Sequence, residues 1–585
     1  MPTFFGDIRR NQVLFNYGPG SLVNFRDEGA VISVIMSELQ VWTAKAAKTK
    51  VNQIFHDTRL LKSLHNMDNR LTNISYFRLP PIQPEDKNNN QLSHPHLQAN
   101  IFPRMMLCGG CRSLKFISNW DQADYRPARY CAKCSKEADK LTYVSPSRFV
   151  VICERGHIDD FPYAHWLNRE NSECETNHKN LKLDQTRGLG LSGLELSCYD
   201  CNAKVSMNGI FNKEMLSYKC RARKPWLIEE NKQEDNEECD CLMQAVQRNS
   251  QSVWTGMNMT SIYVPPWNSD LQEKLGEDEG GIPLWEKIEA HRDDLNRTRQ
   301  FIPLYIEEIN KIPEFSDISE DDFFDMVKKE KELENKANVD LKVDEYNALI
   351  DSDDVISDRN FQMRNIEPLP EKLTYLLRLK EIPRLKEVRA LYAFKRGNGE
   401  PHYINNKVNW LPASEVFGEG VFIEFDGSKI KEVFEENEFA GLLQEEERAL
   451  RKRYILLHSL SHFIMKAICI ESGYSLSSIR ERIYSENDQN GILIYTSSSD
   501  SQGTLGGLSR LANKKRIESV LNRAFQLTSI CSNDPLCSYG TLSVDEISNH
   551  IACHSCILMP ETSCEHFNQL LSRDLAYNFL KKYHV

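Results

Sequence analysis

The most specific chemical signal in the sequence is a pair of Cys-x2-Cys motifs, Cys108-x2-Cys111 and Cys131-x2-Cys134. Each motif forms a tight turn that directs two thiolates at one point, and two such turns complete the tetrahedral shell of a zinc ion. The two glycines inside the first motif favour that turn because they carry no Cβ. The spacing therefore predicts a structural zinc site with four thiolate ligands.

A second group of cysteines follows about sixty residues later. It consists of Cys198-x2-Cys201, then Cys220, then either Cys239 or Cys241. One Cys-x2-Cys turn and two later thiols can complete another four-thiolate shell. Cys239 and Cys241 compete for the fourth position, because they are separated by a single residue.

A third group lies near the C-terminus and holds five thiols, one more than a tetrahedral zinc ion accepts. It comprises Cys531, Cys537, Cys553, Cys556 and Cys564. We expect Cys537, Cys553, Cys556 and Cys564 to be the ligands, with Cys531 as the substitute.

All three groups offer four thiolates and no obvious position for water, so they predict about three structural zinc ions rather than catalytic ones. Such ions supply roughly 10–16 kcal/mol of apparent binding free energy, which becomes folding free energy. Three of the 17 cysteines remain: Cys153, Cys174 and Cys469. The spacings Cys153-x3-His157 and Cys174-x3-His178 suit metal binding, but a buried thiol beside a hydrogen-bonded histidine is the favoured interpretation.

The motif His458-Ser-Leu-Ser-His462 places two imidazoles one helical turn apart. It lacks the glutamate that follows the first histidine of a metalloprotease helix, and no third ligand is evident. The favoured interpretation is a pair of hydrogen-bonded core histidines. The alternative is a metal-dependent nuclease or other hydrolase in which His458 and His462 act with Asp500.

A glycine-rich passage follows the expected strand Gly491–Thr496 and precedes a helix expected from about Leu508. Glycines ahead of a helix N-terminus permit an anion to approach, although a structural tight turn is favoured. The possible contacts to phosphate or nucleic acid are Gly503, Gly506, Gly507 and Arg510. The motif Gly-x4-Gly-Lys-Ser/Thr is absent from the sequence, so no nucleotide-binding P-loop is predicted.

The formal charge of −12 argues against a protein that coats DNA by bulk electrostatics. Any affinity for DNA would have to come from a local basic groove. The stretch Arg221-Ala-Arg-Lys-Pro-Trp226 is a candidate, with Trp226 stacking on a base, but a solvated surface is the favoured interpretation.

At 585 residues the chain is too long for one hydrophobic core, and 40% hydrophobic with 27% charged residues is typical of folded globular proteins. We expect an α+β fold with several domains, including small zinc-binding modules and a C-terminal α/β domain. The expected regions are 1–100 (β-rich), 101–267 (double zinc-ribbon-like), 268–444 (helical and acidic) and 445–585 (α/β with a zinc site).

Several elements follow from apolar patterns. Ala30–Met36 and Phe149–Cys153 predict strands, and a helix is expected near Pro162–Asn168. Apolar residues recur at helical spacing after Glu445 and predict a long buried helix. A second short helix is expected near Ser478, because a glutamate lies at capping-box distance.

The sequence also bears on location. It begins without a basic and apolar leader, and it contains no run of roughly 20 uninterrupted apolar residues, so neither a signal peptide nor a membrane helix is expected. The apolar region Tyr454–Ile470 carries two histidines and a lysine, which favours a buried helix. Many cysteines without a secretory signal fit the reducing cytoplasm and metal binding rather than disulfides.

Six strings of the sequence together resemble one family. They are Arg9-Arg-Asn-Gln-Val-Leu-Phe-Asn-Tyr-Gly-Pro-Gly-Ser-Leu-Val-Asn, Gly156-His-Ile-Asp-Asp-Phe-Pro, Val246-Gln-Arg-Asn-Ser, His458-Ser-Leu-Ser-His, Gly503-Thr-Leu-Gly-Gly-Leu and Ala552-Cys-His-Ser-Cys-Ile-Leu-Met-Pro-Glu-Thr-Ser-Cys-Glu. They resemble the DrmB subunit of the bacterial DISARM anti-phage system. The C-terminal zinc-containing domain of that family also ends certain superfamily-two helicases.

The resemblance implies a non-catalytic accessory subunit that associates with the DrmA helicase-like ATPase and helps it engage or remodel phage DNA. It also implies that Cys553, Cys556 and Cys564 belong to the tail metal site, and it favours Cys239 over Cys241. Asn249 stands where the family often has glycine, and no residue carries over as catalytic.

Overall fold

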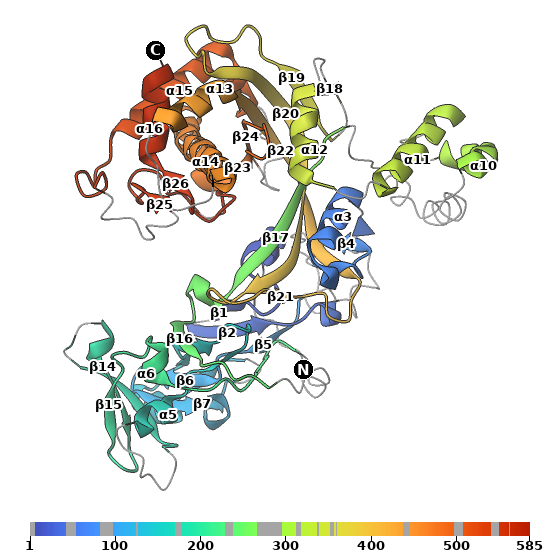
Figure 1. The fold of residues 1–585 in the computed structure, drawn as a ribbon. Helices are drawn as coiled ribbons and strands as arrows, with labels where there is room; N and C mark the ends of the chain where they lie inside the picture. Colours follow the sequence, from blue (N-terminus) through green and yellow to red (C-terminus); the bar gives the residue numbers. More distant parts are fainter. Residues whose placement is uncertain are drawn as a thin grey trace. The chain divides into compact units, whose positions relative to one another are not determined.

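The computed structural model divides the chain into two compact units, each assembled from separate stretches of sequence. Unit 1 comprises Met1–Ile54, Arg70–Met259 and Ala390–Ser414, and unit 2 comprises Phe55–Asn69, Thr260–Arg389 and Glu415–Val585. The residues described are Gly6, 8–27, 29–42, 54–55, 57–81, 97–123, 127–169, 178–186, Gly188, 190–227, 238–265, 295–311, 318–335, 339–351, 356–357, 360–436, 445–496, 507–539, 549–560 and 562–584. The expected α+β class with multiple sheets is confirmed (Figure 1). The four expected sequence regions stay predictions.

Unit 1 is rich in short strands. Its helices are α1 (Arg10–Phe15), α4 (Ala132–Ala138), α5 (Tyr163–Asn168) and α6 (Lys213–Leu216). Its strands are β1 (Leu22–Asp27), β2 (Ala30–Met36), β4 (Tyr76–Arg78), β5 (Ala99–Ile101), β6 (Met105–Cys108), β7 (Ser113–Phe116), β8 (Asp121–Gln122), β9 (Arg129–Tyr130), β10 (Val144–Pro146), β11 (Phe149–Ile152), β12 (Ile158–Asp160), β13 (Leu181–Gln185), β14 (Leu194–Cys198), β15 (Lys204–Ser206), β16 (Gln244–Gln247) and β21 (His402–Tyr403).

Three small sheets organise most of this unit. Strand order is β1-β2-β5 in the first, β10-β6-β7-β13-β14-β15 in the second and β12-β11-β16 in the third. The expected strands at β2 and β11 and the expected helix at α5 are confirmed. Every residue of β11 is buried, which explains why its sequence reads as a continuous apolar run.

A buried arginine ties distant parts of unit 1 together. Arg396 is 1% exposed and donates to the carbonyl oxygens of Gly156 and Gly20, both at 2.8 Å, and of Val253. Its guanidinium carbon lies 5.0 Å from the ring centroid of Trp226, which is also buried. Trp226 is therefore a core residue rather than a platform for a nucleic-acid base.

Unit 2 holds the long helices. They are α3 (Thr58–Met67), α10 (Leu295–Ile309), α11 (Glu320–Asn335), α12 (Leu341–Asp351), α13 (Gly427–Glu436), α14 (Glu445–Ser472), α15 (Lys514–Ser529) and α16 (Arg573–Tyr583). Its strands are β18 (Ile356–Ser357), β19 (Gln362–Asn365), β23 (Ile479–Tyr484), β24 (Gly491–Thr496), β25 (Asn549–His550) and β26 (Leu571–Ser572). Four strands cross the boundaries of the units along the chain: β3 (Ile54–Phe55), β17 (Thr255–Ile262), β20 (Leu376–Lys395) and β22 (Trp410–Phe425).

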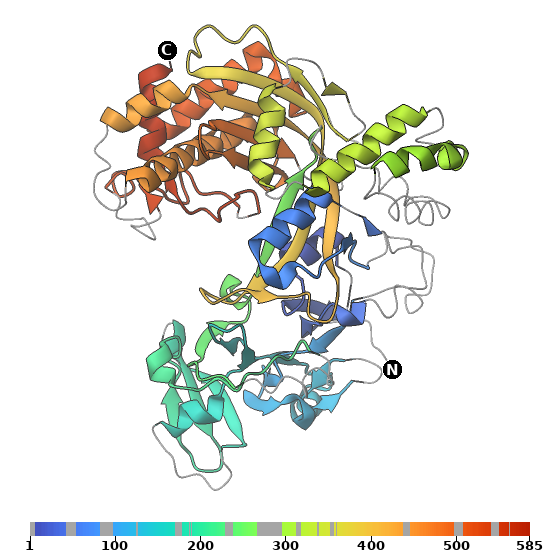
Figure 2. The ribbon, with the colours of Figure 1, turned by 45° about the vertical axis from the view of Figure 1, so that its right-hand side comes forward.

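The main sheet of unit 2 is covered on both faces. Its strands follow the order β18-β19-β20-β22-β24-β23, and β24 pairs antiparallel with both of its neighbours. Helices α14 and α12 lie on opposite faces of this sheet (Figure 1, Figure 2). Ile492 and Ile494 of β24 join the core with α14, whereas Leu493 and Tyr495 join the core with α12. The two-sided burial explains why this strand is apolar throughout.

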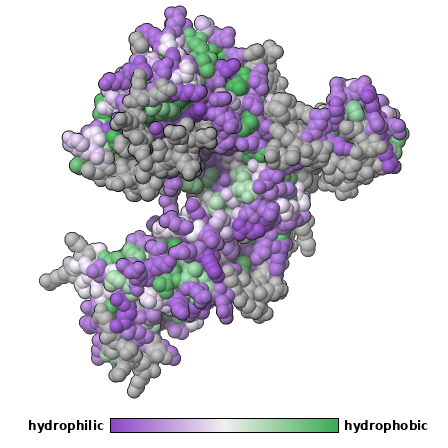
Figure 3. All heavy atoms as spheres, in the orientation of Figure 1, coloured by the Kyte–Doolittle hydropathy of each residue, from purple (hydrophilic) through white to green (hydrophobic). Residues whose placement is uncertain are grey.

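Helix α14 is the central helix of this unit, as its apolar spacing predicts. The segment Arg451–Ser472 is long and apolar enough to cross a membrane by length and composition, but 67% of its most apolar window is buried inside the molecule. Its apolar residues pack against β24, α15 and α16. On the face drawn in Figure 3, hydrophilic residues cover most of the coloured surface and apolar residues form small separate patches.

The short helix expected near Ser478 is wrong. A single 3-10 turn covers Leu476–Ser478, and the following residues form strand β23. Arg482 on this strand makes a bidentate ion pair with Glu345, with both N–O distances at 2.8 Å and both side chains buried. Pairing with β24 and this buried ion pair hold the segment extended, which overrides the local helix signal.

Candidate metal centres

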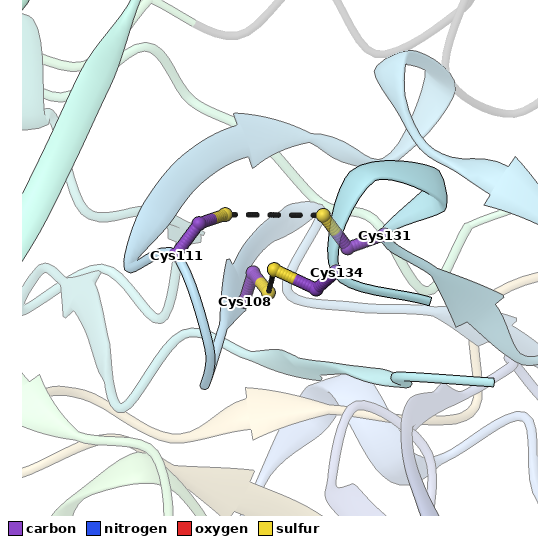
Figure 4. A group of neighbouring side chains, drawn as sticks. All are labelled: Cys108, Cys111, Cys131 and Cys134. Atoms are coloured by element: carbon purple, nitrogen blue, oxygen red, sulfur yellow. Dashed lines mark hydrogen bonds between the residues drawn. The ribbon is translucent and has the colours of Figure 1, made fainter. Parts of the chain in front are cut away.

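The four cysteines of the first predicted site lie together, and we call them the ribbon cluster (Figure 4). Cys108 Sγ lies 3.7 Å from Cys134 Sγ, and Cys111 Sγ lies 3.8 Å from Cys131 Sγ. Four thiolates at about 2.3 Å from a central zinc ion lie about 3.8 Å from one another. A disulfide would bring two sulfurs to about 2.05 Å. The four thiols therefore fit a tetrahedral zinc ion and are not paired as disulfides.

Local backbone geometry builds the ribbon cluster. Cys108 ends β6, and the tight turn to β7 closes with a hydrogen bond from the N–H of Arg112 to the carbonyl of Cys108 at 3.0 Å. A Cβ on Gly110 would lie 3.0 Å from Cys134 Sγ, so this position favours glycine. Cys131 is the N-cap residue of α4, which places Cys134 on its first turn.

A second cluster contains two expected zinc ligands, Cys220 and Cys239, together with Cys153 and His157, which are not among the expected ligands. In this hairpin cluster, Cys153, His157, Cys220 and Cys239 are all buried, with their ligand atoms within 4.8 Å of one another. Cys153 Sγ lies 3.3 Å from His157 Nδ1 and 3.7 Å from Cys220 Sγ. The favoured buried thiol beside a histidine is present at Cys153 and His157, and two further thiols, Cys220 and Cys239, give this group four potential metal ligands.

Strand pairing explains why these ligands meet. Cys153 follows β11 and His157 precedes β12, in a hairpin whose turn contains Gly156 at φ +81°. Strand β16 pairs with the other edge of β11, which brings the preceding Cys239 to the same place. The neighbouring Cys241 is outside the cluster, and its carbonyl accepts the N–H of Cys220 at 2.9 Å.

The expected shell of Cys198, Cys201, Cys220 and Cys239 is corrected accordingly. Cys198 and Cys201 lie instead beside His178, with 3.5 Å between Cys201 Sγ and His178 Nδ1. We call these three residues the triad cluster. Cys174, which the spacing linked to His178, lies outside the described residues.

The C-terminal thiols form the tail cluster of Cys531, Cys537, Cys553 and Cys556, all buried. Cys531 Sγ lies 3.5 Å from Cys553 Sγ, and Cys537 Sγ lies 3.8 Å from Cys556 Sγ. The expected ligand set is corrected at one position, because Cys531 takes the place given to Cys564. The loop from Cys531 to Cys537 is held by Arg573, whose guanidinium donates twice to Asp534, at 2.8 and 3.1 Å.

One thiol in each of the ribbon, hairpin and tail clusters has a pKa below neutrality. Burial raises the pKa of Cys111, but hydrogen bonds with Ser113, Cys108 and Cys134 outweigh it and lower the pKa to about 6. A hydrogen bond from the Cys220 thiol lowers the pKa of Cys153 to about 4. Burial likewise opposes the thiolate of Cys553, but hydrogen bonds from neighbouring cysteine thiols lower its pKa to about 6. Each cluster therefore offers a thiolate, the form that binds metal.

Cys564 lies in a fifth group, with His458, His462 and Glu481, which we call the helix cluster. No third ligand is evident from the sequence, but the structure places two further potential ligands, Glu481 and Cys564, beside the two histidines. The sequence predicts a helix at Glu481, whereas this residue belongs to β23. Asp500, the residue of the hydrolase alternative, lies outside the described residues.

The glycine-rich passage is described only from Gly507 onward, so Gly503 and Gly506 lie outside the described residues. A Cβ on Gly507 would approach the Tyr474 hydroxyl to 2.3 Å, which explains the glycine by close packing. The N–H of Leu508 donates to a carboxylate oxygen of Glu419 at 2.7 Å. The carboxylate of Glu419 thus occupies the position at this turn where an external anion would bind. The side chain of Arg510 is exposed to solvent.

Comparison with known proteins gives a relative that matches nearly the whole chain. The chain is 27% identical to the DISARM protein DrmB of Bacillus paralicheniformis over 582 residues, which cover 93% of this chain and 96% of the relative. The resemblance to DrmB is confirmed. Two family models also match: residues 9–255 fit a domain of unknown function, DUF8724, and residues 460–557 fit the MrfA Zn-binding domain.

The matched ranges agree with the clusters. The DUF8724 range contains all of the ribbon, hairpin and triad clusters. The MrfA Zn-binding range contains all four thiols of the tail cluster but ends before Cys564 and begins after His458. Four buried thiols fit the zinc that this domain name specifies, and they make the tail cluster the candidate zinc site within the matched range.

Proposed function

We propose that this chain is a non-catalytic, zinc-stabilised subunit of a DISARM anti-phage system. The observation that carries the proposal is the similarity to DrmB, which extends over almost the full length of both chains. Because the match covers nearly all of both chains, it supports the same order of domains in this chain as in DrmB, rather than one shared domain.

Zinc would act structurally in this subunit. The ribbon, hairpin and tail clusters each offer four ligand groups, which leaves no coordination position for a substrate. Each cluster joins segments that the chain order separates, as Cys153 and Cys220 illustrate. We therefore assign one zinc ion to each of these clusters and a role in stiffening the surrounding loops.

The partner that we propose is a DrmA-like helicase or ATPase acting on phage DNA in the cytoplasm. The sequence lacks a P-loop motif, so the energy for remodelling DNA would come from another subunit. The net charge of −12 favours DNA contact through the assembled complex over strong binding by this chain alone.

Co-expression of the tagged full-length chain with its helicase-like neighbour tests this proposal. We expect the two proteins to co-elute in size-exclusion chromatography at 150 mM salt, with ATPase activity only in fractions that contain the helicase. Failure to co-elute, or ATP hydrolysis by the isolated chain, would overturn the proposal.

The hydrolase alternative predicts a different result from the same preparation. It requires a substrate to reach His458 and His462, but both side chains are 0% exposed. Metal-dependent DNA cleavage by the isolated chain that disappears in His462→Ala and persists in Cys469→Ser would favour the alternative.

A further inference from the structure

The helix cluster brings four potential metal ligands from three separate elements into one buried place. His458 and His462 lie one turn apart on α14, Glu481 lies on β23, and Cys564 lies in the loop that follows the tail cluster. The ligand atoms all lie within 4.8 Å of one another. None of the four side chains is more than 7% exposed.

Hydrogen bonds orient both imidazoles toward the centre of the cluster. The Nδ1 atom of His458 faces the carbonyl oxygen of Leu570 at 3.2 Å, and that of His462 faces the carbonyl oxygen of Ile557 at 2.9 Å. A nitrogen that faces a carbonyl oxygen must carry the proton, so in a neutral imidazole the Nε2 atom holds a lone pair. Metal-binding histidines are held by this kind of bond from their second nitrogen.

The groups opposite the two Nε2 atoms are also acceptors. Glu481 Oε1 lies 2.9 Å from Nε2 of His458 and 3.4 Å from Nε2 of His462. Cys564 Sγ lies 3.1 Å from Nε2 of His458. Lone pairs that face one another in a buried site repel unless a proton or a metal cation lies between them.

Nε2 of His462 is a buried polar atom without a hydrogen-bond partner among the described residues. Protons on both rings would place two imidazolium ions in one buried site, with their ring centroids 4.6 Å apart and the carboxylate of Glu481 between them and the strand. One divalent ion would satisfy all four ligands at once. Nitrogen and oxygen ligands at about 2.0–2.1 Å from zinc lie about 3.3 Å apart. The 3.4 Å between Nε2 of His462 and Oε1 of Glu481 is close to this separation, and the 2.9 Å from Nε2 of His458 is shorter.

The anionic ligands are held by a second layer of hydrogen bonds. Cys564 Sγ accepts the backbone N–H groups of His566 at 3.4 Å and Asn568 at 3.1 Å, which favours a thiolate. Glu481 Oε1 accepts the N–H of Glu565 at 3.1 Å, and the hydroxyl of Ser461 donates to Oε2. These bonds fix both groups in place for a metal ion.

We propose that His458, His462, Glu481 and Cys564 bind a divalent transition-metal ion of the zinc class, as a site separate from the tail cluster. The match to the MrfA Zn-binding domain covers His462 and Glu481 but does not reach His458 or Cys564, so it does not assign this site. The set of two nitrogens, one oxygen and one sulfur suits zinc, and four protein ligands leave no open position. The ion would join α14, β23 and the tail loop.

Metal counting on the full-length chain tests the site. Zinc per chain is measured by inductively coupled plasma mass spectrometry for the wild type, Cys564→Ala and the control Cys469→Ser. Cys469 also lies on α14 but belongs to no cluster among the described residues. We expect Cys564→Ala to lose one zinc ion per chain, whereas Cys469→Ser keeps the wild-type content. Equal zinc content in the folded variants would overturn the proposal.

A measurement on the unaltered protein decides the matter if Cys564→Ala does not fold. In wild-type chain loaded with ¹¹³Cd, each site gives its own resonance, and a single thiolate ligand shifts it much less than three or four thiolates do. We expect one signal in the range of a single thiolate with nitrogen and oxygen ligands. The absence of that signal while the thiolate-rich signals are present would overturn the proposal and leave the other clusters intact.

Discussion

Replacement of Arg396 by methionine should destabilise unit 1, because three carbonyl oxygens would lose their donors. The guanidinium donates to Gly20, Gly156 and Val253, which belong to segments far apart in the sequence. Gly20 and Gly156 lie in two of the sequence strings that resemble DrmB. The hydrogen bonds from Arg396 therefore hold these two strings together in the folded unit. Methionine fills a similar volume without donating a hydrogen bond.

The magnitude follows from the number of acceptors left buried. An unsatisfied buried carbonyl costs about 1–3 kcal/mol, and a carbonyl with a second lone pair or nearby water falls at the low end. Three of them at about 1 kcal/mol each give a loss of about 3 kcal/mol for Arg396→Met. A loss of this size lowers the Tm of a domain of 150–250 residues by roughly 6–12 °C.

Differential scanning calorimetry of the zinc-loaded chain measures this effect. Arg155→Met is the matched control, because Arg155 is exposed and donates a single bond of 3.4 Å to the Glu238 carbonyl. The control should stay within about 0.5 kcal/mol of wild type, as surface substitutions usually do. If Arg396→Met unfolds at the same temperature as Arg155→Met, the reasoning about the buried carbonyls is refuted.

Three further predictions concern the metal clusters and the core of unit 2. Cys239→Ser should lose one zinc ion per chain by mass spectrometry, whereas Cys241→Ser should lose none; the reverse pattern would contradict the hairpin cluster. Glu345→Gln should cost about 3–5 kcal/mol in denaturant unfolding because it leaves Arg482 buried without its charge partner. The double replacement of Glu345 and Arg482 by methionine should lower the free energy of unfolding less than Glu345→Gln does, because it leaves no unpaired buried charge. If the losses from the two single replacements simply add in the double variant, the proposed ion pair does not contribute to stability. Zinc release in the presence of a chelator should increase as the pH falls from 7 to 5, because thiolate ligands must be deprotonated; a pH-independent release rate would speak against thiolate ligation.

The parts of the fold that the sequence predicts are those set by local pattern. Strands β2 and β11 and helix α14 appear where continuous or periodic apolar residues place them. The ribbon cluster is also predictable, because each Cys-x2-Cys turn positions two ligands by itself. Sequence patterns therefore predict those elements and sites whose structure depends on residues that are close together in the chain.

The hairpin and helix clusters were out of reach because strand pairing assembles them. Cys220 meets Cys153 across 67 residues, and no spacing rule connects them. The motif Cys153-x3-His157 is a local signal for this site, but the same spacing is also typical of a buried thiol beside a hydrogen-bonded histidine. Glu481 was missed for a related reason, since its place on β23 depends on pairing with β24.

The native mass spectrum of the full-length chain, purified with its thiols reduced, tests the central claim most directly. Bound zinc adds to the mass of the folded chain and is lost on denaturation in acid. We predict at least three zinc ions per chain, one for each of the ribbon, hairpin and tail clusters. A folded chain with no bound metal would contradict the claim that these thiols are ligands.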